Sequence, residues 1–168
     1  ILYGMFPPSE GTITINGKTF ANMSPKMAID AGVGMVHQHF MLIEPLTVTE
    51  NIILGYEEDT GLFLDRKTAR EKISKLSEEY GLMIDPDARV EDITVGQQQR
   101  VEILKALYRG ADILIFDEPT AVLTPQEINE FIVIINRLTK MGKSIIIITH
   151  KLSEIKAMAD NCTIIRRG

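Results

Sequence analysis

Residues 111–120 read ADILIFDEPT, an apolar run that stops at two adjacent carboxylates, Asp117 and Glu118, and then a proline. A continuous apolar run is typical of a strand in a parallel sheet that is covered on both faces, and ligands of such sheets bind beyond the carboxyl ends of the strands. We therefore predict a buried strand that presents Asp117 and Glu118 at a binding edge. An ordinary polar turn after the strand explains the stretch equally well.

The composition indicates one globular domain. The chain has 168 residues, of which 45% are hydrophobic, enough for one substantial core. A net charge of −5 provides no basic stripe for nucleic acid, so we expect no nucleic-acid partner. The longest aliphatic run, Ile145–Ile148, is far shorter than the ~20 residues that span a bilayer. The single cysteine, Cys162, lies in an apolar run, so we expect a buried thiol in a reducing compartment, by default the cytoplasm.

The two ends of the chain predict different kinds of sheet. Residues 11–20 alternate apolar and polar side chains around Asn16-Gly17, the pattern of an antiparallel hairpin. Residues 33–36 read as a short buried strand. From Asp112 onward the order is strand, helix, strand, helix and a final strand, which implies parallel βαβ units.

Between these parts the chain predicts a helical insertion. Thr47–Glu50 forms a capping box that opens one helix, and a second helix opens at Asp65 and is stopped by Gly81. Strand signals are missing from about residue 51 to residue 89. We therefore divide this single domain into an antiparallel part (1–46), a helical part (47–92) and a parallel core (93–168).

A candidate anion site begins the helix that follows the insertion. Thr94 is the expected N-cap, with Gln97 completing a capping box, and the helix runs to about Arg109. Because Gly96 leaves the first turn uncluttered, its free N–H groups and the helix dipole can bind an anion such as phosphate. A well-capped amphipathic helix without a ligand explains the same residues.

Two further polar residues follow predicted strands. His150 lies at the same sheet edge as Glu118 if their strands are parallel neighbours, where a histidine can donate to a phosphate. Gln38 follows the strand at residues 33–36, and its amide can contact Mg²⁺ or a water. His37 and His39 flank Gln38, but no third ligand with suitable spacing supports a zinc site.

Taken together and in this order, these elements resemble an ATP-binding cassette of the ABC type. The matching elements are the Q-loop glutamine (Gln38), the signature sequence (Ile93–Gln97), the Walker B carboxylates (Asp117 and Glu118) and the switch histidine (His150). The resemblance implies an α/β fold of the P-loop NTPase type, with an N-terminal antiparallel β hairpin, a helical subdomain and a parallel βαβ core. It also implies an ATPase that uses ATP and Mg²⁺.

The resemblance assigns a role to each residue. Glu118 orients or activates the attacking water, His150 stabilises the γ-phosphate, Gln38 senses it, and Asp117 holds the Mg²⁺ shell, with Gln38 as a second group near the metal. In this family two cassettes pair head to tail, so the signature residues of one face the ATP held by the other. Those residues are Thr94, Gly96 and Gln97.

Residues 95–105 and 120–127 resemble more narrowly the first of two fused cassettes in bacterial importers for nucleosides or simple sugars. This likeness implies a second cassette, transmembrane permease subunits, an indirect link to a solute-binding protein, and a peripheral place on the cytoplasmic face of the membrane. The chain departs from the general family at Val95, where glycine is usual, and at Thr124, where aspartate is usual.

The P-loop motif GxxxxGK[ST] is absent from the 168 residues. Gly142-Lys143-Ser144 is not part of one, because residue 137, five positions earlier, is arginine and the tripeptide precedes a strand. Ile1–Met5 resembles the end of the helix that follows a P-loop. We therefore expect a truncated cassette that by itself binds ATP weakly and hydrolyses it negligibly.

Two other functions remain open at this point. A soluble ABC ATPase that acts on the ribosome or DNA uses the same catalytic set, although the chain lacks basic segments. Alternatively, without a P-loop the chain is a non-catalytic interaction module.

Overall fold

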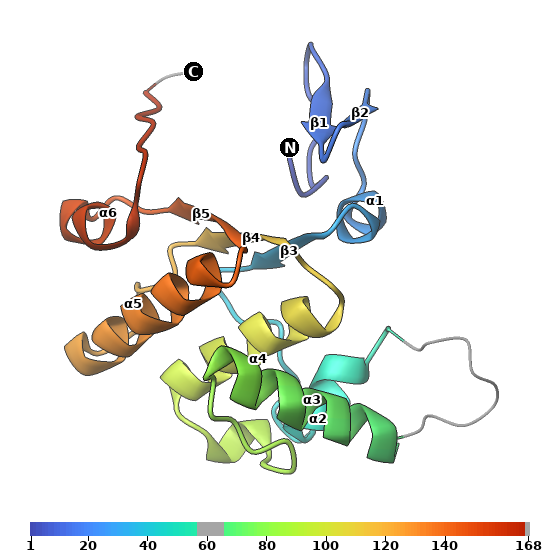
Figure 1. The fold of residues 1–168 in the computed structure, drawn as a ribbon, viewed down its shortest axis with the longest axis vertical. Coiled ribbons are helices and arrows are strands. Elements are labelled where there is room, and N and C mark those ends of the chain that lie inside the picture. The colour runs from blue at the N-terminus through green and yellow to red at the C-terminus, as the bar shows by residue number, and fades with distance from the viewer. Residues whose placement is uncertain (57–65, 167–168) are drawn as a thin grey trace.

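The computed structural model of the chain describes residues 1–56 and 66–166. Two sheets and six α-helices alternate along this part of the chain (Figure 1). The strands are β1 (Ile13–Ile15), β2 (Lys18–Phe20), β3 (Val33–Val36), β4 (Ile113–Asp117) and β5 (Ser144–Ile148). The helices are α1 (Pro25–Asp30), α2 (Val48–Ile53), α3 (Arg66–Tyr80), α4 (Val95–Tyr108), α5 (Pro125–Lys140) and α6 (Leu152–Met158), with a short 3₁₀ turn at Val90–Asp92.

The hairpin predicted around Asn16-Gly17 is confirmed. β1 and β2 pair antiparallel, with Ile15 opposite Lys18. Both turn residues have positive φ, 48° at Asn16 and 79° at Gly17, as a two-residue type I′ turn requires. The Asn-Gly pair is therefore the local cause of the hairpin.

The parallel core is also confirmed. β4 is the central strand of the order β3-β4-β5 and pairs in parallel with both neighbours. Phe116 lies opposite Val36 on one side and Ile147 on the other. This register brings the carboxyl ends of all three strands to one edge of the sheet.

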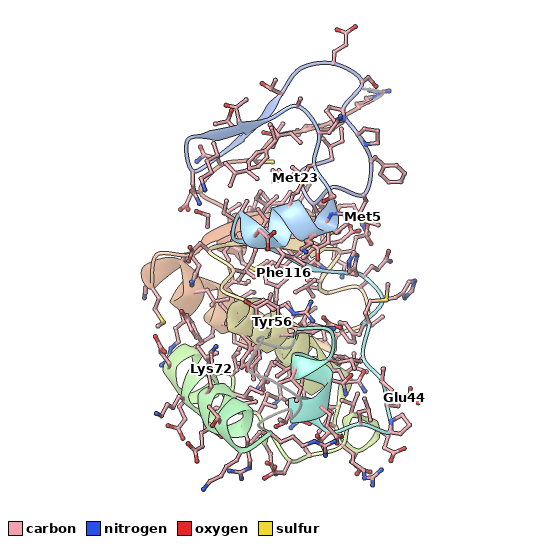
Figure 2. All side chains as sticks on the ribbon, turned by 90° about the vertical axis from the view of Figure 1, so that its right-hand side faces the viewer. Met5, Met23, Glu44, Tyr56, Lys72 and Phe116 are labelled. Atoms are coloured by element: carbon pink, nitrogen blue, oxygen red, sulfur yellow. The ribbon has the colours of Figure 1, made fainter. Side chains whose placement is uncertain are left out.

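Different elements cover the two faces of the parallel sheet. The β1–β2 hairpin and α1 lie on one face, while α4 and α5 lie on the other (Figure 1). Phe116 is fully buried with Phe131 of α5, and Met23 packs into a smaller cluster under the hairpin (Figure 2). Gly34 lets β3 approach α4 closely, because a Cβ at this position would lie 2.8 Å from that of Ala106.

The two helices predicted between residues 47 and 92, α2 and α3, form and share the main core. The Thr47 side chain caps α2 in a complete capping box with Glu50, and Gly81 ends α3 with φ of 68°. Ile52 and Ile73 join the same buried cluster as α4. Asp65, the predicted start of the second helix, lies outside the described residues.

Two predictions near the C-terminus are wrong. No strand follows α6 within the described residues: residues 161–166 extend away from the sheet without a pairing partner (Figure 1). Cys162 is exposed, as are Ile164 and Ile165 at 88% and 83%. An apolar run becomes buried only when another element covers it, so the expected buried thiol is absent from this fold.

No helix in the described part of the chain combines the length and the apolar character needed to cross a lipid bilayer.

One carboxylate joins the starts of two helices. Glu127 accepts hydrogen bonds at Oε2 from the backbone N–H (2.9 Å) and hydroxyl (2.8 Å) of Thr124, which caps α5. Its Oε1 accepts the Gly96 N–H at 3.1 Å, in the first turn of α4. The bonds from Thr124 lower the pKa of Glu127 below its ordinary value of 4.5, against a smaller desolvation effect, and the Gly96 N–H lowers it further. Glu127 therefore contributes stability as an ionised group.

We predict that Glu127→Gln lowers the free energy of unfolding by about 1–2 kcal/mol at pH 7, because the amide has one acceptor oxygen and no charge, so it cannot accept from both Thr124 and the Gly96 N–H. Because the folded-state pKa is depressed, this contribution is complete above about pH 4.5 and is lost as pH falls through the folded-state value. Urea unfolding at several pH values measures the difference between the variant and the unaltered protein. A difference that stays constant on acidification, or that equals the effect of Glu10→Gln at an exposed site, would contradict the assignment.

Candidate functional site

The carboxyl edge of the parallel sheet gathers polar residues from three strands. Gln38 lies two residues beyond β3, Asp117 ends β4 with Glu118 next to it, and His150 lies two residues beyond β5. The expectation that the strands of Glu118 and His150 are parallel neighbours is confirmed. The pairing register, and not proximity in the sequence, brings these residues to one edge.

Glu118 and His150 are in direct contact. His150 Nδ1 lies 3.0 Å from Glu118 Oε1, with side-chain exposures of 71% for His150 and 32% for Glu118. Glu118 also donates its backbone N–H to the Ile148 carbonyl at 2.9 Å, which continues the link between the two strands past the end of β4.

The backbone of Glu118 is strained. Its φ of 45° is in the left-handed region, which costs a non-glycine residue roughly 1–3 kcal/mol. Conformations of this kind persist only where the surrounding structure enforces them, and they are common at functional sites. The turn directs the chain away from β4 immediately after Asp117.

The contact determines which histidine nitrogen carries a proton. An ionised carboxylate only accepts hydrogen bonds, so His150 Nδ1 must be the donor to Glu118. The second ring nitrogen of this mostly exposed side chain then remains available to a ligand. The pair can therefore place a carboxylate and an imidazole side by side against one substrate group.

Asp117 and Gln38 provide oxygen atoms at the same edge. Asp117 is partly buried and Gln38 is exposed. Among the described residues no group of three or more His, Cys, Asp or Glu side chains forms a metal cage. This sparse donor set fits Mg²⁺, which retains several waters and uses one or two carboxylates together with substrate phosphates.

The start of α4, where the sequence predicted an anion site, has the expected capping box, and one of its N–H groups is bonded to a side chain of the same chain. Thr94 caps the helix in a complete capping box with Gln97. Thr94 is exposed, whereas Gly96 is buried and its N–H is bonded to Glu127. The contact between Glu127 and Gly96 joins residues 31 positions apart, and no local pattern in the sequence predicted it.

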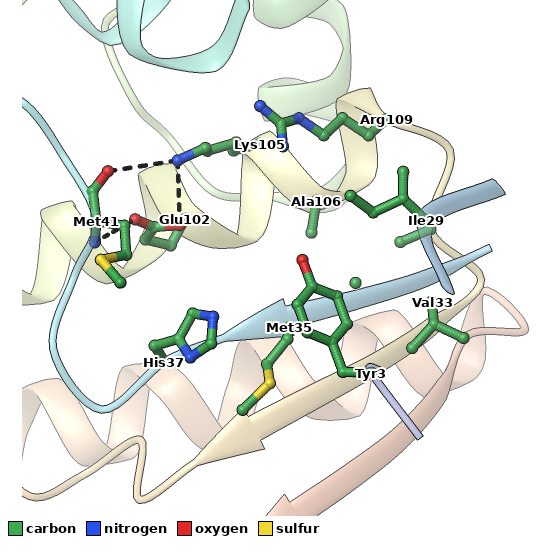
Figure 3. Close-up of a pocket in the computed structure, with 12 residues that line it drawn as sticks. Tyr3, Ile29, Val33, Met35, His37, Met41, Glu102, Lys105, Ala106 and Arg109 are labelled. Atoms are coloured by element: carbon green, nitrogen blue, oxygen red, sulfur yellow. Dashed lines mark hydrogen bonds and ion pairs between the residues drawn. The ribbon is translucent and has the colours of Figure 1, made fainter. Parts of the chain in front are cut away.

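A pocket of about 190 Å³ lies between β3 and the C-terminal half of α4, away from these residues (Figure 3). Tyr3, Lys105 and Arg109 are among the residues that line it, and no predicted site residue does so. Burial raises the pKa of Tyr3, which Arg109 partly offsets. His37 also lines this pocket and packs edge-on against the Tyr3 ring, whereas His39 is exposed.

Gly142-Lys143-Ser144 lies at the opposite edge of the sheet. Gly142 ends α5 with φ of 86°, and Ser144 begins β5. The Lys143 ammonium donates to Asp112 at 2.7 Å, next to the start of β4. The tripeptide therefore connects α5 to β5 and precedes a strand, as the sequence indicated.

Sequence reasoning missed a buried network beneath the Glu118–His150 pair. Glu154 of α6 is 3% exposed and binds Thr120, Thr149 and Lys151. Thr120 and Thr149 follow the ends of β4 and β5, so the missed residues join the two loops that carry the pair. The only signal in the sequence was an acidic residue on the short helix after His150, which by itself does not predict burial.

Comparison with known proteins extends over the whole chain. The nucleoside import ATP-binding protein NupA of Lactococcus lactis subsp. cremoris (strain MG1363) is 64% identical over 168 residues, which cover 100% of this chain and 33% of that protein. The guanosine import ATP-binding protein NupO of Bacillus subtilis (strain 168) is 55% identical, with the same coverages of 100% and 33%. The chain thus spans about a third of the length of these curated relatives.

Solved structures show the same fold. CbiO1 from Clostridium perfringens, described as part of the ABC transporter complex CbiONQ, superposes with a TM-score of 0.75 at 25% identity, covering 95% of this chain and 63% of that one. The family described as ABC transporter matches residues 1–121, from the N-terminus through the Walker B carboxylates and the turn after them. The chain therefore belongs to the ABC transporter family of ATP-binding cassettes.

Proposed function

We propose that this chain is part of the ATP-hydrolysing motor subunit of an ABC importer for nucleosides or simple sugars. The observation that carries the proposal is the 3.0 Å contact between Glu118 and His150 at the carboxyl edge of a parallel sheet, in a chain of this family. A carboxylate that can accept a proton from water lies beside an imidazole that can donate to phosphate.

Glu118 acts on the attacking water. Its carboxylate orients the water and accepts its proton as the water oxygen bonds to the γ-phosphorus, while the bond from that phosphorus to the β–γ bridging oxygen breaks and ADP leaves. His150 holds the Glu118 carboxylate through Nδ1 and, when protonated, donates from its other nitrogen to a γ-phosphate oxygen. Charge that develops on the phosphoryl oxygens is thereby stabilised.

Asp117 and Gln38 are the residues that hold Mg²⁺ in this proposal. The ion, when bound, neutralises charge on the β- and γ-phosphates. Asp117 contributes a carboxylate from the end of β4, and Gln38 an amide oxygen that also senses the γ-phosphate.

The first turn of α4 contacts ATP held by a second cassette. Thr94 offers its hydroxyl, Gly96 its backbone N–H at the positive end of the helix dipole, and Gln97 its side-chain NH₂, since the Gln97 backbone N–H already donates to the Thr94 hydroxyl at 3.3 Å. Because Glu127 occupies the Gly96 N–H here, phosphate binding at this turn requires that carboxylate to move.

The names of the relatives support the cargo and the partners. NupA and NupO are named for nucleoside and guanosine import, and the sequence likeness to importers with fused cassettes extends the choice to simple sugars. Transmembrane permease subunits and, indirectly, a solute-binding protein complete the importer, with this chain on the cytoplasmic face of the membrane. Uptake of labelled nucleosides and sugars by cells lacking the gene separates the cargo classes.

We predict that Glu118→Gln in the full-length gene product lowers kcat for ATP hydrolysis by about 100-fold or more while ATP binding is retained, because the amide keeps the size of the side chain but cannot accept the proton. Phosphate release measures kcat, and isothermal titration measures binding. Glu10→Gln, at an exposed position on the hairpin side, is the matched control. Turnover equal to that of the control would remove Glu118 from this role.

We predict that residues 1–168 by themselves hydrolyse ATP negligibly, since this stretch contains no GxxxxGK[ST] motif to hold the β- and γ-phosphates. Phosphate release by the purified 168-residue polypeptide is compared with release by the full-length gene product at equal concentration. Comparable rates from the two proteins would refute this prediction and would favour a phosphate site elsewhere in the chain.

A further inference from the structure

Glu154 is a buried acidic side chain that the mechanism above does not use. It lies on α6 and is only 3% exposed. Burial of an ionised carboxylate is unfavourable unless hydrogen bonds and an opposite charge compensate it. Its surroundings therefore have to supply both.

Three donors surround the carboxylate. The Thr120 hydroxyl donates to Oε1, the Thr149 hydroxyl donates to Oε2 at 2.8 Å, and the Lys151 ammonium lies 3.4 Å from Oε1. Burial raises the pKa of Glu154, but the hydrogen bonds from Thr120, Thr149 and Lys151 together hold it below its ordinary value. The group is therefore ionised and fully engaged.

The hydrogen bonds of this network have a defined direction. Because the carboxylate only accepts, both threonine hydroxyls must donate to it, and their lone pairs are left to accept. The Lys151 ammonium donates to the Thr120 hydroxyl at 3.0 Å and to the Thr120 carbonyl at 3.1 Å. The Lys151 backbone N–H donates to the Thr149 hydroxyl at 3.1 Å. Each hydroxyl thus has one orientation that satisfies all of its partners.

The network joins the two loops that carry the catalytic pair. Thr120 lies two residues after Glu118, and Thr149 immediately precedes His150. Beyond the bond from the Glu118 N–H to the Ile148 carbonyl the strands have ended, so β-ladder hydrogen bonds do not hold the later residues of the loops together. The exposed His150 and the left-handed backbone of Glu118 both need support from the surrounding structure.

We infer that Glu154 is a positioning residue for the Glu118–His150 pair, which it holds in place by binding the loops after β4 and β5 through the hydroxyls of Thr120 and Thr149. This inference rests on the proposed ATPase function. Glu154 does not touch the reacting atoms. It sets the distance between the groups that do.

Glu154→Gln in the full-length gene product is the first test. The amide preserves size, but its NH₂ group cannot accept a hydrogen bond from a hydroxyl and meets the donors already present. We expect kcat for ATP hydrolysis to fall about tenfold or more, since small misplacement of catalytic groups is costly, while KM for ATP stays within about threefold.

Substitutions at Thr120 separate the hydrogen bond from the packing. Thr120→Val removes the hydroxyl and keeps the shape, so we expect the same loss of kcat as for Glu154→Gln. Thr120→Ser keeps the hydroxyl, so we expect this variant to retain most of the kcat of the unaltered protein. The matched control is Thr49→Val. It removes the hydroxyl of another buried threonine, which lies in α2 and donates to the Pro86 carbonyl at 2.8 Å. We expect this substitution to leave kcat unchanged.

Several results overturn the inference. These are a Glu154→Gln protein with unaltered kcat, a KM that rises in proportion to the loss of kcat, or equal losses from Thr120→Ser and Thr120→Val. A structure of the Glu154→Gln protein in which His150 Nδ1 remains 3.0 Å from Glu118 Oε1 also overturns it, whether or not the protein hydrolyses ATP. If the unaltered protein does not hydrolyse ATP, the proposed function is wrong. If the Glu118–His150 contact is nevertheless broken in the Glu154→Gln protein, the positioning role remains supported.

Discussion

β4 pairs in parallel with β3 on one side and with β5 on the other, and this double pairing determines where every residue of the carboxyl edge lies. A shift of one residue in either ladder would reverse the faces of a strand and expose buried side chains such as Phe116. The register that buries the core is therefore the same register that brings Glu118 next to His150. Packing and chemistry depend on a single arrangement of hydrogen bonds.

The polar groups at this edge are organised in two layers. The outer layer, Glu118 and His150, is accessible and can meet a ligand. The inner layer is a set of hydrogen bonds around the buried Glu154. A buried polar network is costly when incomplete and rigid when complete, so a complete inner layer suits the support of an exposed outer one.

The first turns of α4 and α5 are linked in a comparable way. Glu127 satisfies N–H groups of both helices, so the signature turn and the turn after the Walker B strand share one carboxylate. Any anion that approaches Gly96 competes with Glu127. One carboxylate thus connects the signature turn to the start of α5 within one chain.

Local patterns in the sequence predicted most elements correctly, because their causes are local. Asn16-Gly17 has the backbone freedom of a type I′ turn, and Thr47 and Thr94 each cap a helix with a partner three residues on. The apolar run before Asp117 predicted the buried strand β4, because the hydrophobic pattern of a strand is also a local feature. By contrast, the final strand and the buried Cys162 were wrong, because burial of an apolar run depends on a neighbouring element that the run itself does not specify.

The sequence by itself determined which side chains are available for chemistry at strand ends and helix starts, since those positions follow from hydrophobic period and capping. Only the tertiary structure decided which of them meet. The Glu118–His150 contact joins residues 32 positions apart, Glu127 reaches Gly96 across 31 positions, and Glu154 reaches Thr120 across 34. Contacts over such separations arise from strand register and helix packing, which depend on the whole core and not on any one segment.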